Sequence, residues 1–453
     1  MRTPAPESRP VALTIAGSDS GGGAGIQADL ATMAAHGVFG TSAITAVTAQ
    51  NTRGVESSHV LPTAEIAAQL EAVTDDFAVG AAKTGMLATT EVIETVAEYA
   101  QEFAFPLVVD PVMVATSGDR LLEPEAERAY EELLGTATVA TPNADEAEVL
   151  TDIAVTDEET AREAGEAILE TGVDAVLVKG GHVPGERVRD TLVTAETVRT
   201  FEHPRVGTEA THGSGCALAA AIAARLATGE PLESAVEGAT DFLARAVRYP
   251  YDVGEGHGAV NHMHPLRNDA AREPTAEEVQ AIVDRFVAAD VSALVPEVGM
   301  NVVGATPYAE SVAETAAVEG RITRTLSGVR PNRGVRFGAS SHMARFLLSA
   351  REFVPDLRFA VNCRFDADVE AALEALAWPI AEYDRGDQPA EIRETEGSTM
   401  GWGARQAFAA REEPPVAVVD RGEVGKEALV KIVAADPETL ADRTLALERE
   451  VTR

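Results

Sequence analysis

The feature that most constrains the fold is the alternation of short, β-branched apolar runs with alanine-rich stretches of helical periodicity. The pattern begins at residues 11–16 (VALTIA) and continues to a helical stretch at 231–248. Repeated strand–helix units of this kind predict a mostly parallel sheet with helices on both faces. The predicted strands are 11–16, 42–48, 79–84, 107–110, 138–141 and 175–180, and the predicted helices are 63–73, 89–103, 123–134, one after Gly215 and 231–248.

A second α/β pattern follows a break in periodicity at residues 262–275, which hold two prolines and clustered charge. We therefore predict a first domain of residues 1–266 and a smaller second domain of residues 267–453. In the second domain we expect helices at 277–289 and 369–376 and strands at 357–363 and 415–420.

The charge of the chain narrows the possible partners. Its net charge is −36, and of 37 basic residues four are lysines, at positions 83, 179, 426 and 431. An acidic surface that favours arginine over lysine is typical of halophile proteins, which carboxylates keep hydrated. The same charge argues against nucleic acid or an anionic membrane as a partner.

Cysteine content and hydropathy indicate a cytoplasmic protein. The two cysteines, Cys216 and Cys363, lie far apart in unlike contexts, which suits a reducing compartment. No apolar run approaches the roughly 20 residues of a membrane span, and the first 19 residues do not resemble a signal peptide. We therefore expect no membrane partner.

Two glycine-rich segments predict a phosphate site. The loop at 16–29 (AGSDSGGGAGIQAD) follows a strand and opens a helix, and Gly213, Ser214 and Gly215 precede a second helix. A helix N-terminus offers unpaired amides and partial positive charge to a phosphoryl group. Cys216, in the first turn, is either a base favoured there as a thiolate or a small buried apolar residue.

Two further segments suit phosphoryl transfer. In TPNADE (141–146), Asn143 and Glu146 lie one helical turn apart and could hold a magnesium-bound phosphate through water. In VKGGH (178–182), Lys179 ends a predicted strand beside two glycines. Because this chain has so few lysines, Lys179, and with less weight Lys83, are candidate functional residues.

These segments together resemble the hydroxymethylpyrimidine/phosphomethylpyrimidine kinases of thiamine biosynthesis, members of the ribokinase superfamily. The resemblance runs from about residue 11 to 264. It implies a ribokinase-like sandwich with a mostly parallel central sheet, followed here by a second, smaller α/β domain. The motifs that carry it are AGSDSGGGAGIQADL, ITAVTAQNT, KTGML, VVDPVMVATSGDRLL, TPNADEAEVL, VLVKGGH and THGSGC.

The resemblance implies ATP- and Mg²⁺-dependent phosphorylation of 4-amino-5-hydroxymethyl-2-methylpyrimidine to its monophosphate and then its diphosphate. It also implies a homodimer. By position it assigns the pyrimidine pocket to Gly17, Asp29, Gln50, Met86 and Val112. It assigns ATP and the anion hole to Asn143, Lys179, Gly213, Ser214 and Gly215, the metal to Glu146 and Asp110, and the catalytic base to Cys216. A pyridoxal-type vitamin kinase of the same fold is the alternative.

The second half contains an unusual arginine cluster. Residues 319–336 hold five arginines, at 321, 324, 330, 333 and 336, against one acidic residue. Arginine forks suit a diphosphate. In GASSHMARF (338–346), Ser340 and Ser341 are predicted helix caps and His342 stands at the helix start. This start is either a second anion site or a cap alone.

Residues from about 275 to 450 resemble the archaeal thiamine-phosphate synthase domain. The motifs are VPEVGMNVVGATP, the arginine segment, FGASSHMARFLL and EGSTMGWG. The resemblance implies catalytic roles for Arg321 and His342. The implied reaction joins the pyrimidine diphosphate to 4-methyl-5-(2-phosphooxyethyl)thiazole and releases thiamine phosphate and pyrophosphate. The alternative is a second domain that senses thiamine phosphate and regulates.

Overall fold

The chain divides into two compact units, residues 1–264 and 265–453, described in turn. The computed structural model describes residues 7–113, 127–389, 398–409, 413–423 and 425–453. The division falls two residues before the predicted boundary, between His264 and Pro265. Pro265 and Pro274 both lie in the first turns of helices, α9 (His264–Ala270) and α10 (Arg272–Ala289). The break in periodicity therefore reflects two helix starts, where proline is tolerated.

The first unit is built on a nine-stranded sheet, counted over the described residues, with strand order β3-β2-β1-β4-β5-β6-β7-β8-β9. The central strands are parallel, whereas β3, β8 and β9 run antiparallel to their neighbours. This confirms the mostly parallel α/β sheet; the antiparallel strands were not predicted. The strands are β1 (Val11–Ser18), β2 (Phe39–Asn51), β3 (Gly54–Val60), β4 (Val79–Thr84), β5 (Leu107–Val109), β6 (Val139–Ala140), β7 (Ala175–Val178), β8 (Arg187–Thr194) and β9 (Val198–Pro204).

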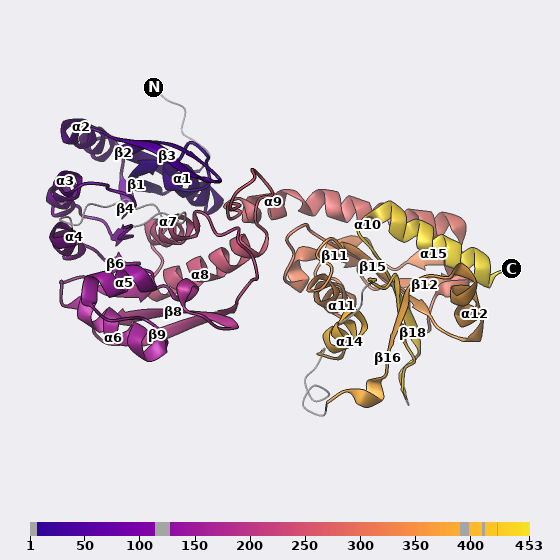
Figure 1. Ribbon diagram of the computed structural model, residues 1–453. Coiled ribbons are helices and arrows are strands. Elements are labelled where there is room, and N and C mark those ends of the chain that lie inside the picture. The colour runs from indigo at the N-terminus through magenta and orange to yellow at the C-terminus, as the bar shows by residue number, and fades with distance from the viewer. Residues whose placement is uncertain (1–6, 114–126, 390–397, 410–412, 424) are drawn as a thin grey trace, which may run out of the picture. The chain divides into compact units, whose positions relative to one another are not determined.

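Helices cover both faces of this sheet (Figure 1). One apolar core joins the sheet to helices α2 to α6, and two others join its opposite face to α1, α7 and α8. The predicted helix at 123–134 is described from residue 127 onward. The helices are α1 (Gly25–Ala35), α2 (Thr63–Thr74), α3 (Thr90–Ala100), α4 (Glu127–Leu134), α5 (Ala144–Thr151), α6 (Glu158–Leu169), α7 (Ser214–Ala227) and α8 (Leu232–Arg248).

The second unit has a seven-stranded sheet within its described residues, in the order β14-β11-β10-β15-β18-β17-β16. Only β16 and β17 are parallel among these pairs. Helices α10, α12 and α15 pack on one face, and α11 and α14 on the other. The strands are β10 (Val302–Ala305), β11 (Thr315–Val318), β14 (Val335–Phe337), β15 (Phe359–Arg364), β16 (Ile380–Tyr383), β17 (Ala417–Asp420) and β18 (Leu429–Ala434), with the hairpin β12 (Ile322–Thr325) and β13 (Gly328–Pro331) beside them. The remaining helices are α11 (Ser341–Arg351), α12 (Ala367–Leu376), α14 (Ser398–Phe408) and α15 (Pro437–Val451).

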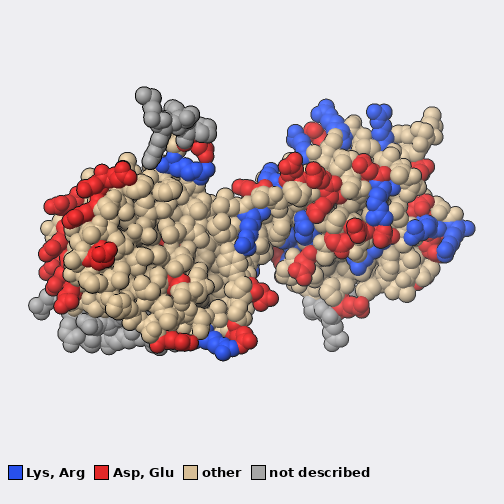
Figure 2. Space-filling view, turned by 90° about the horizontal axis from the view of Figure 1, so that it is seen from above, with Lys and Arg blue, Asp and Glu red and all other residues tan. Residues whose placement is uncertain are grey.

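The surface charge differs between the units. In Figure 2, acidic side chains line one edge of the first unit, while basic and acidic side chains intermingle over the second.

Within the described ranges, no helix is long and apolar enough to cross a membrane.

Candidate active site

A cavity of about 760 Å³ lies in the first unit at the carboxyl ends of its parallel strands. Ser18 ends β1, Met86 follows β4, Asp110 follows β5, Asn143 follows β6 and Lys179 follows β7, and all five line the cavity. Ligands of open α/β sheets bind at this edge, because the loops that follow parallel strands converge there.

At the centre of the cavity a lysine connects two carboxylates. Lys179 Nζ lies 2.8 Å from Asp110 Oδ1 and 3.6 Å from Glu146 Oε2. Thr141 Oγ1 donates to Asp110 Oδ1 at 3.0 Å. Burial raises the pKa of Glu146 to about 7, against the opposing effect of Lys179. Burial opposes the charge of Lys179 too, but Asp110 and Glu146 outweigh it and raise the pKa of this ammonium group.

Asn143 and Glu146 cap helix α5 reciprocally. Glu146 N donates to Asn143 Oδ1 at 2.8 Å, and Asn143 N donates to Glu146 Oε2 at 2.7 Å. This capping box fixes both side chains at the cavity wall. The pair predicted to hold a phosphate thus also begins a helix.

Helix α7 directs its N-terminus at the same centre. A Cβ added to Gly215 would lie 3.5 Å from both Asp110 Oδ2 and Lys179 Nζ. Gly213 adopts φ +79°, and a Cβ there would collide with the carbonyl oxygen of Gly23 at 1.8 Å. Glycine is therefore required at 213, where the loop meets the glycine-rich segment after β1. Ser214, the first residue of α7, also lines the cavity.

Cys216 lies in the first turn of α7 and lines the cavity, as predicted from its position. Burial raises the pKa of its thiol to about 11, although Lys83 acts in the opposite direction. The expected stabilisation of a thiolate by the helix start is therefore outweighed by desolvation, and the thiol is neutral near pH 7.

The pocket predicted for the pyrimidine divides into two parts. Gly17, Gln50, Met86 and Val112 line the cavity. A Cβ on Gly17 would lie 2.3 Å from the Met86 methyl group, so glycine leaves the space that this side chain occupies. Gln50 Oε1 accepts a hydrogen bond from Thr48 Oγ1 at 3.2 Å, which orients its amide.

Asp29 instead lies behind the cavity wall. Among the described residues it is absent from the cavity lining, and its side chain is fully buried. Its Oδ2 lies 3.0 Å from Lys83 Nζ and accepts from Thr14 Oγ1 at 2.6 Å. Burial by itself would lower the pKa of Lys83, but Asp29 outweighs it and the pKa is raised. Lys83, flagged by its rarity, is thus the buried partner of Asp29.

The sequence did not predict a histidine that joins the two glycine-rich segments. His212 Nε2 lies 3.0 Å from Asp19 Oδ2, and both residues line the cavity. Asp19 also accepts from the amides of Gly21, Gly23 and Ala24 at 2.8–3.0 Å. Burial opposes this ionisation, but His212 and the amides lower the pKa of Asp19. The position of His212 directly before Gly213 was the available signal.

In the second unit the two predicted catalytic residues are both exposed. Arg321 follows β11, adopts φ +71° and donates to the carbonyl of Val298. His342 lies in the first turn of α11. Ser340 occupies the N-cap position, but in the described part of the chain its side chain makes no capping hydrogen bond, which corrects the prediction of a serine cap. Arg333 and Arg336 lie 3.5 and 3.6 Å from Glu319, which offsets part of the arginine cluster.

Residues 19–261, more than half of the chain, match the family Phosphomethylpyrimidine kinase. The chain belongs to this family. Residues 278–446 match the family Thiamine-phosphate synthase ThiN. The phosphomethylpyrimidine kinase domain is thus joined to a ThiN domain in one chain, which confirms both resemblances.

Relatives cover the kinase domain. The hydroxymethylpyrimidine/phosphomethylpyrimidine kinase of Haemophilus influenzae is 50% identical over 256 residues, which are 55% of this chain and 95% of that protein. The thiamine biosynthesis bifunctional protein ThiED of Geobacter sulfurreducens is 45% identical over 261 residues, 57% of this chain and 53% of that protein. An ADP complex of Bacillus subtilis pyridoxal kinase matches with a TM-score of 0.54 and 36% identity, over 57% of this chain and 99% of that one. This match confirms the ribokinase-like fold of the first unit.

Proposed function

We propose that the chain is a bifunctional enzyme of thiamine biosynthesis. The first domain uses ATP to phosphorylate 4-amino-5-hydroxymethyl-2-methylpyrimidine to the monophosphate and then to the diphosphate. The second domain joins this diphosphate to 4-methyl-5-(2-phosphooxyethyl)thiazole. The observation that carries the kinase step is the meeting of Lys179, Asp110, Glu146 and the start of α7 at the centre of one cavity.

The kinase centre stabilises charge as it develops on the transferred phosphoryl group. Lys179 supplies a point charge, and the amides of Gly213 and Gly215 supply donors, whereas the Ser214 amide donates to the carbonyl of Thr211 at 3.1 Å. Asn143 lines the same cavity, and we assign it to the nucleotide. Because the transition state of phosphoryl transfer is loose, positioning matters more than strong base catalysis. We therefore assign Cys216 to orienting the acceptor hydroxyl, since its thiol is neutral near pH 7.

The donor set fits Mg²⁺. Asp110 and Glu146 offer carboxylate oxygens, the ligands this ion prefers. The described residues contain no group of three or more His, Cys, Asp or Glu side chains able to hold a metal by themselves. Substrate phosphates and water would therefore complete the coordination. When bound, the ion would neutralise phosphate charge, and Lys179 keeps the two carboxylates together.

The acceptor is recognised at the other end of the cavity. The Gln50 amide can donate to a ring nitrogen and accept from an exocyclic amine of the pyrimidine. Gly17, Met86 and Val112 supply contact surface, whereas Asp29 and Lys83 pair with each other outside the cavity lining. A pyridoxal-type kinase is the second candidate, because the matched ADP-bound structure is a pyridoxal kinase.

In the second domain, Arg321 and His342 would bind the diphosphate group of the pyrimidine substrate, which leaves as pyrophosphate. The thiazole nitrogen attacks the methylene carbon, the C–N bond forms, and the C–O bond breaks with its electron pair going to pyrophosphate. Cationic donors stabilise that charge. The remaining proposals are a homodimer, which the resemblance to the kinase family implies, and a cytoplasmic setting. The net charge of −36 favours a halophilic setting.

One coupled assay tests the proposal. Purified chain is supplied with ATP, Mg²⁺, the hydroxymethylpyrimidine and the thiazole phosphate, and the products are separated by chromatography. We expect thiamine phosphate and pyrophosphate. Accumulated pyrimidine diphosphate without thiamine phosphate would favour the sensing role for the second domain. A parallel reaction with pyridoxal decides between the two kinase candidates by the ratio of kcat/KM values.

A further inference from the structure

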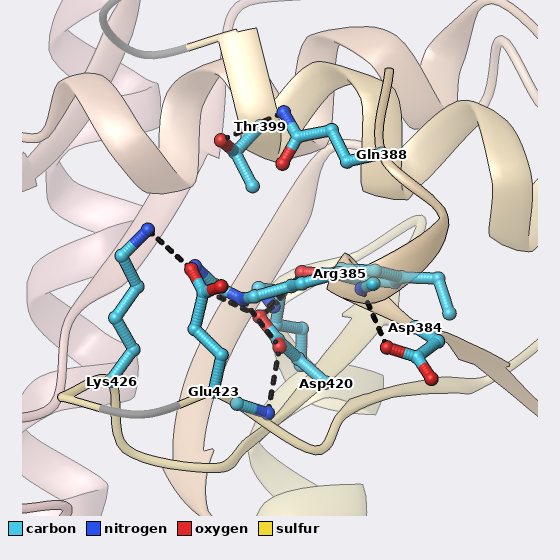
Figure 3. A network of polar contacts seen from close by, with 11 residues as sticks. Asp384, Arg385, Gln388, Thr399, Asp420, Glu423 and Lys426 are labelled. Carbon is cyan, nitrogen blue, oxygen red and sulfur yellow. Dashed lines mark hydrogen bonds and ion pairs between the residues drawn. The ribbon is translucent and has the colours of Figure 1, made fainter. Parts of the chain in front are cut away.

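Two buried aspartates join segments that are distant in sequence, one in each unit. In the second unit, Arg385 donates to both carboxylate oxygens of Asp420 (Figure 3). Glu423 pairs with Arg385 and with Lys426, at 3.9 and 2.7 Å. Each of these charges has a partner of opposite sign, so this network needs no ligand to explain it. Asp19 of the first unit differs, because it lines the cavity of the kinase centre and the mechanism proposed above does not use it.

Asp19 organises the glycine-rich loop that follows β1. Its Oδ1 accepts from the amide of Gly21 at 2.8 Å, and its Oδ2 accepts from the amides of Gly23 and Ala24 at 3.0 and 2.8 Å. Burial opposes the ionisation of this side chain, but the hydrogen bonds from His212 and from the amides lower the pKa of Asp19. Its carboxylate is therefore ionised near pH 7 and can only accept hydrogen bonds.

The remaining donor to this carboxylate is His212, which lies 193 positions further along the chain. His212 Nε2 lies 3.0 Å from Asp19 Oδ2. Because the carboxylate only accepts, the imidazole must carry a hydrogen on Nε2. The ring also lies against Gly23, where an added Cβ would be 2.5 Å from the Cδ2 atom of His212. Glycine at position 23 thus leaves the space that the imidazole occupies.

The backbone of His212 is held by the segment that follows α8. His212 N donates to the carbonyl of Gly258 at 3.3 Å, and Val260 N donates to the carbonyl of His212 at 3.2 Å. The next residue, Gly213, is the N-cap of α7. The imidazole therefore extends from a fixed backbone, directly before the amides assigned to the phosphoryl group, to the loop that follows β1.

The contact between Asp19 and His212 joins two sides of the cavity. Gly17 and Asp19 belong to the segment that lines the pocket proposed for the pyrimidine, whereas His212 precedes the start of α7. Phosphoryl transfer needs the acceptor oxygen in line with the phosphorus and close to it, and a misplacement of about 1 Å can cost about 100-fold in rate. The relative position of these two segments therefore affects the rate of the chemical step.

We propose that His212 is a positioning residue of the kinase reaction, whose hydrogen bond to Asp19 sets the position of the acceptor loop relative to the amides at the start of α7. The proposal deepens the kinase function proposed above and rests on it. The pair transfers no proton to the substrate. It acts on the geometry of the transition state, because Lys179 and Gln50, assigned to the nucleotide and the pyrimidine, stay in place when the hydrogen bond is lost.

The test compares His212→Phe with His212→Gln in the full chain. Phenylalanine keeps a ring against Gly23 but removes the donor, whereas the glutamine amide can place an N–H near the position of Nε2. We expect His212→Phe to lower kcat for the hydroxymethylpyrimidine on the order of tenfold or more, with both KM values within about threefold of wild type. His212→Gln should keep kcat within about threefold of wild type. His59→Phe, at an exposed histidine of β3, is the matched control and should change neither constant.

Two results would overturn the proposal. One is a kcat of His212→Phe within about twofold of wild type, and the other is an equal loss of kcat in His212→Phe and His212→Gln. If His212→Phe melts well below the wild-type chain, His212→Asn replaces it, because its shorter amide does not reach Asp19. A kcat of His212→Asn below that of His212→Gln then supports the hydrogen bond, and equal values reject it.

The wild-type chain separates this proposal from the function on which it rests. If wild type does not phosphorylate the hydroxymethylpyrimidine, the proposed acceptor is wrong, and the same variants are compared with pyridoxal as the acceptor. The same order of kcat values with pyridoxal supports the positioning role of His212, and equal kcat values in all variants reject it.

Discussion

Lys179 Nζ lies 2.8 Å from Asp110 Oδ1, and Asp110 comes from the end of a different strand. This ion pair joins the loops that follow β5 and β7, and Glu146 extends it to the start of α5. The pair thereby fixes where a phosphate can meet positive charge in the first domain.

Replacing Lys179 by Met should abolish most kinase activity. The change removes the cation that faces the transferred group and leaves Asp110 and Glu146 as neighbouring carboxylates. We expect kcat/KM to fall on the order of 100-fold or more, measured with ATP and the hydroxymethylpyrimidine. The synthase reaction of the same variant, supplied with pyrimidine diphosphate, is the control and should be unchanged. Retained kinase turnover would show that Lys179 has no role in the kinase reaction.

Cys216 should react slowly with alkylating reagents at neutral pH. Because burial raises the pKa of its thiol to about 11, few molecules carry the thiolate near pH 7. We expect the rate of iodoacetamide labelling at Cys216, followed by mass spectrometry, to keep rising up to about pH 11. Cys216→Ala should lose most kinase turnover while its melting temperature stays close to wild type. Rapid labelling at pH 7 would contradict the neutral thiol.

The buried pair of Lys83 and Asp29 should behave as a unit. Lys83→Met leaves the Asp29 carboxylate buried without its counter-charge, so we expect a loss of about 3–5 kcal/mol in the free energy of unfolding. Asp29→Asn combined with Lys83→Met should recover most of that loss, because neither charge remains. Urea unfolding of the single and double variants measures this coupling. Additive losses would show that the two side chains act independently.

His262 should make the first domain sensitive to acid. Burial lowers the pKa of this histidine to about 4, and its Nε2 has no hydrogen-bond partner among the described residues. The unfolded chain binds the proton more readily than the folded chain. The contribution of neutral His262 to the free energy of unfolding is therefore complete above pH 6.5 and is lost as the pH falls through 4. We expect a loss of about 2–3 kcal/mol over this range. His262→Phe should flatten the dependence of the urea midpoint on pH between 7 and 4. An unchanged slope would show that other groups cause the pH dependence.

Substitutions in the second domain should separate the two reactions. Arg321→Ala and His342→Ala change exposed residues, so folding should be retained. We expect kinase rates equal to wild type and coupling at least about tenfold slower in each variant, since a hydrogen-bond donor that faces the leaving pyrophosphate is removed. Arg345→Ala, on the same helix as His342, serves as an exposed control. Equal coupling by all three variants would place the synthase centre elsewhere.

The sequence predicted the strands of the first domain well where apolar runs are buried on both faces, as in β4 and β7. It did not predict β8 and β9, because these antiparallel strands are rich in polar residues and depend on pairing with β7 and with each other. Pro265 and Pro274 interrupted the helical pattern in the sequence, although both stand where a helix accepts proline.

What the sequence by itself determined is which residue types stand at strand ends and helix starts, since those positions follow from local periodicity. Lys179, Cys216 and Gly213 could be assigned to a phosphate site on that basis. Only the tertiary structure decided which of these groups meet and which are buried. Asp29 lies behind the cavity wall with Lys83, His212 reaches Asp19, and Lys431 contacts Asp420. Such contacts join residues distant in sequence, and the burial that sets their pKa values arises only when separate elements pack together.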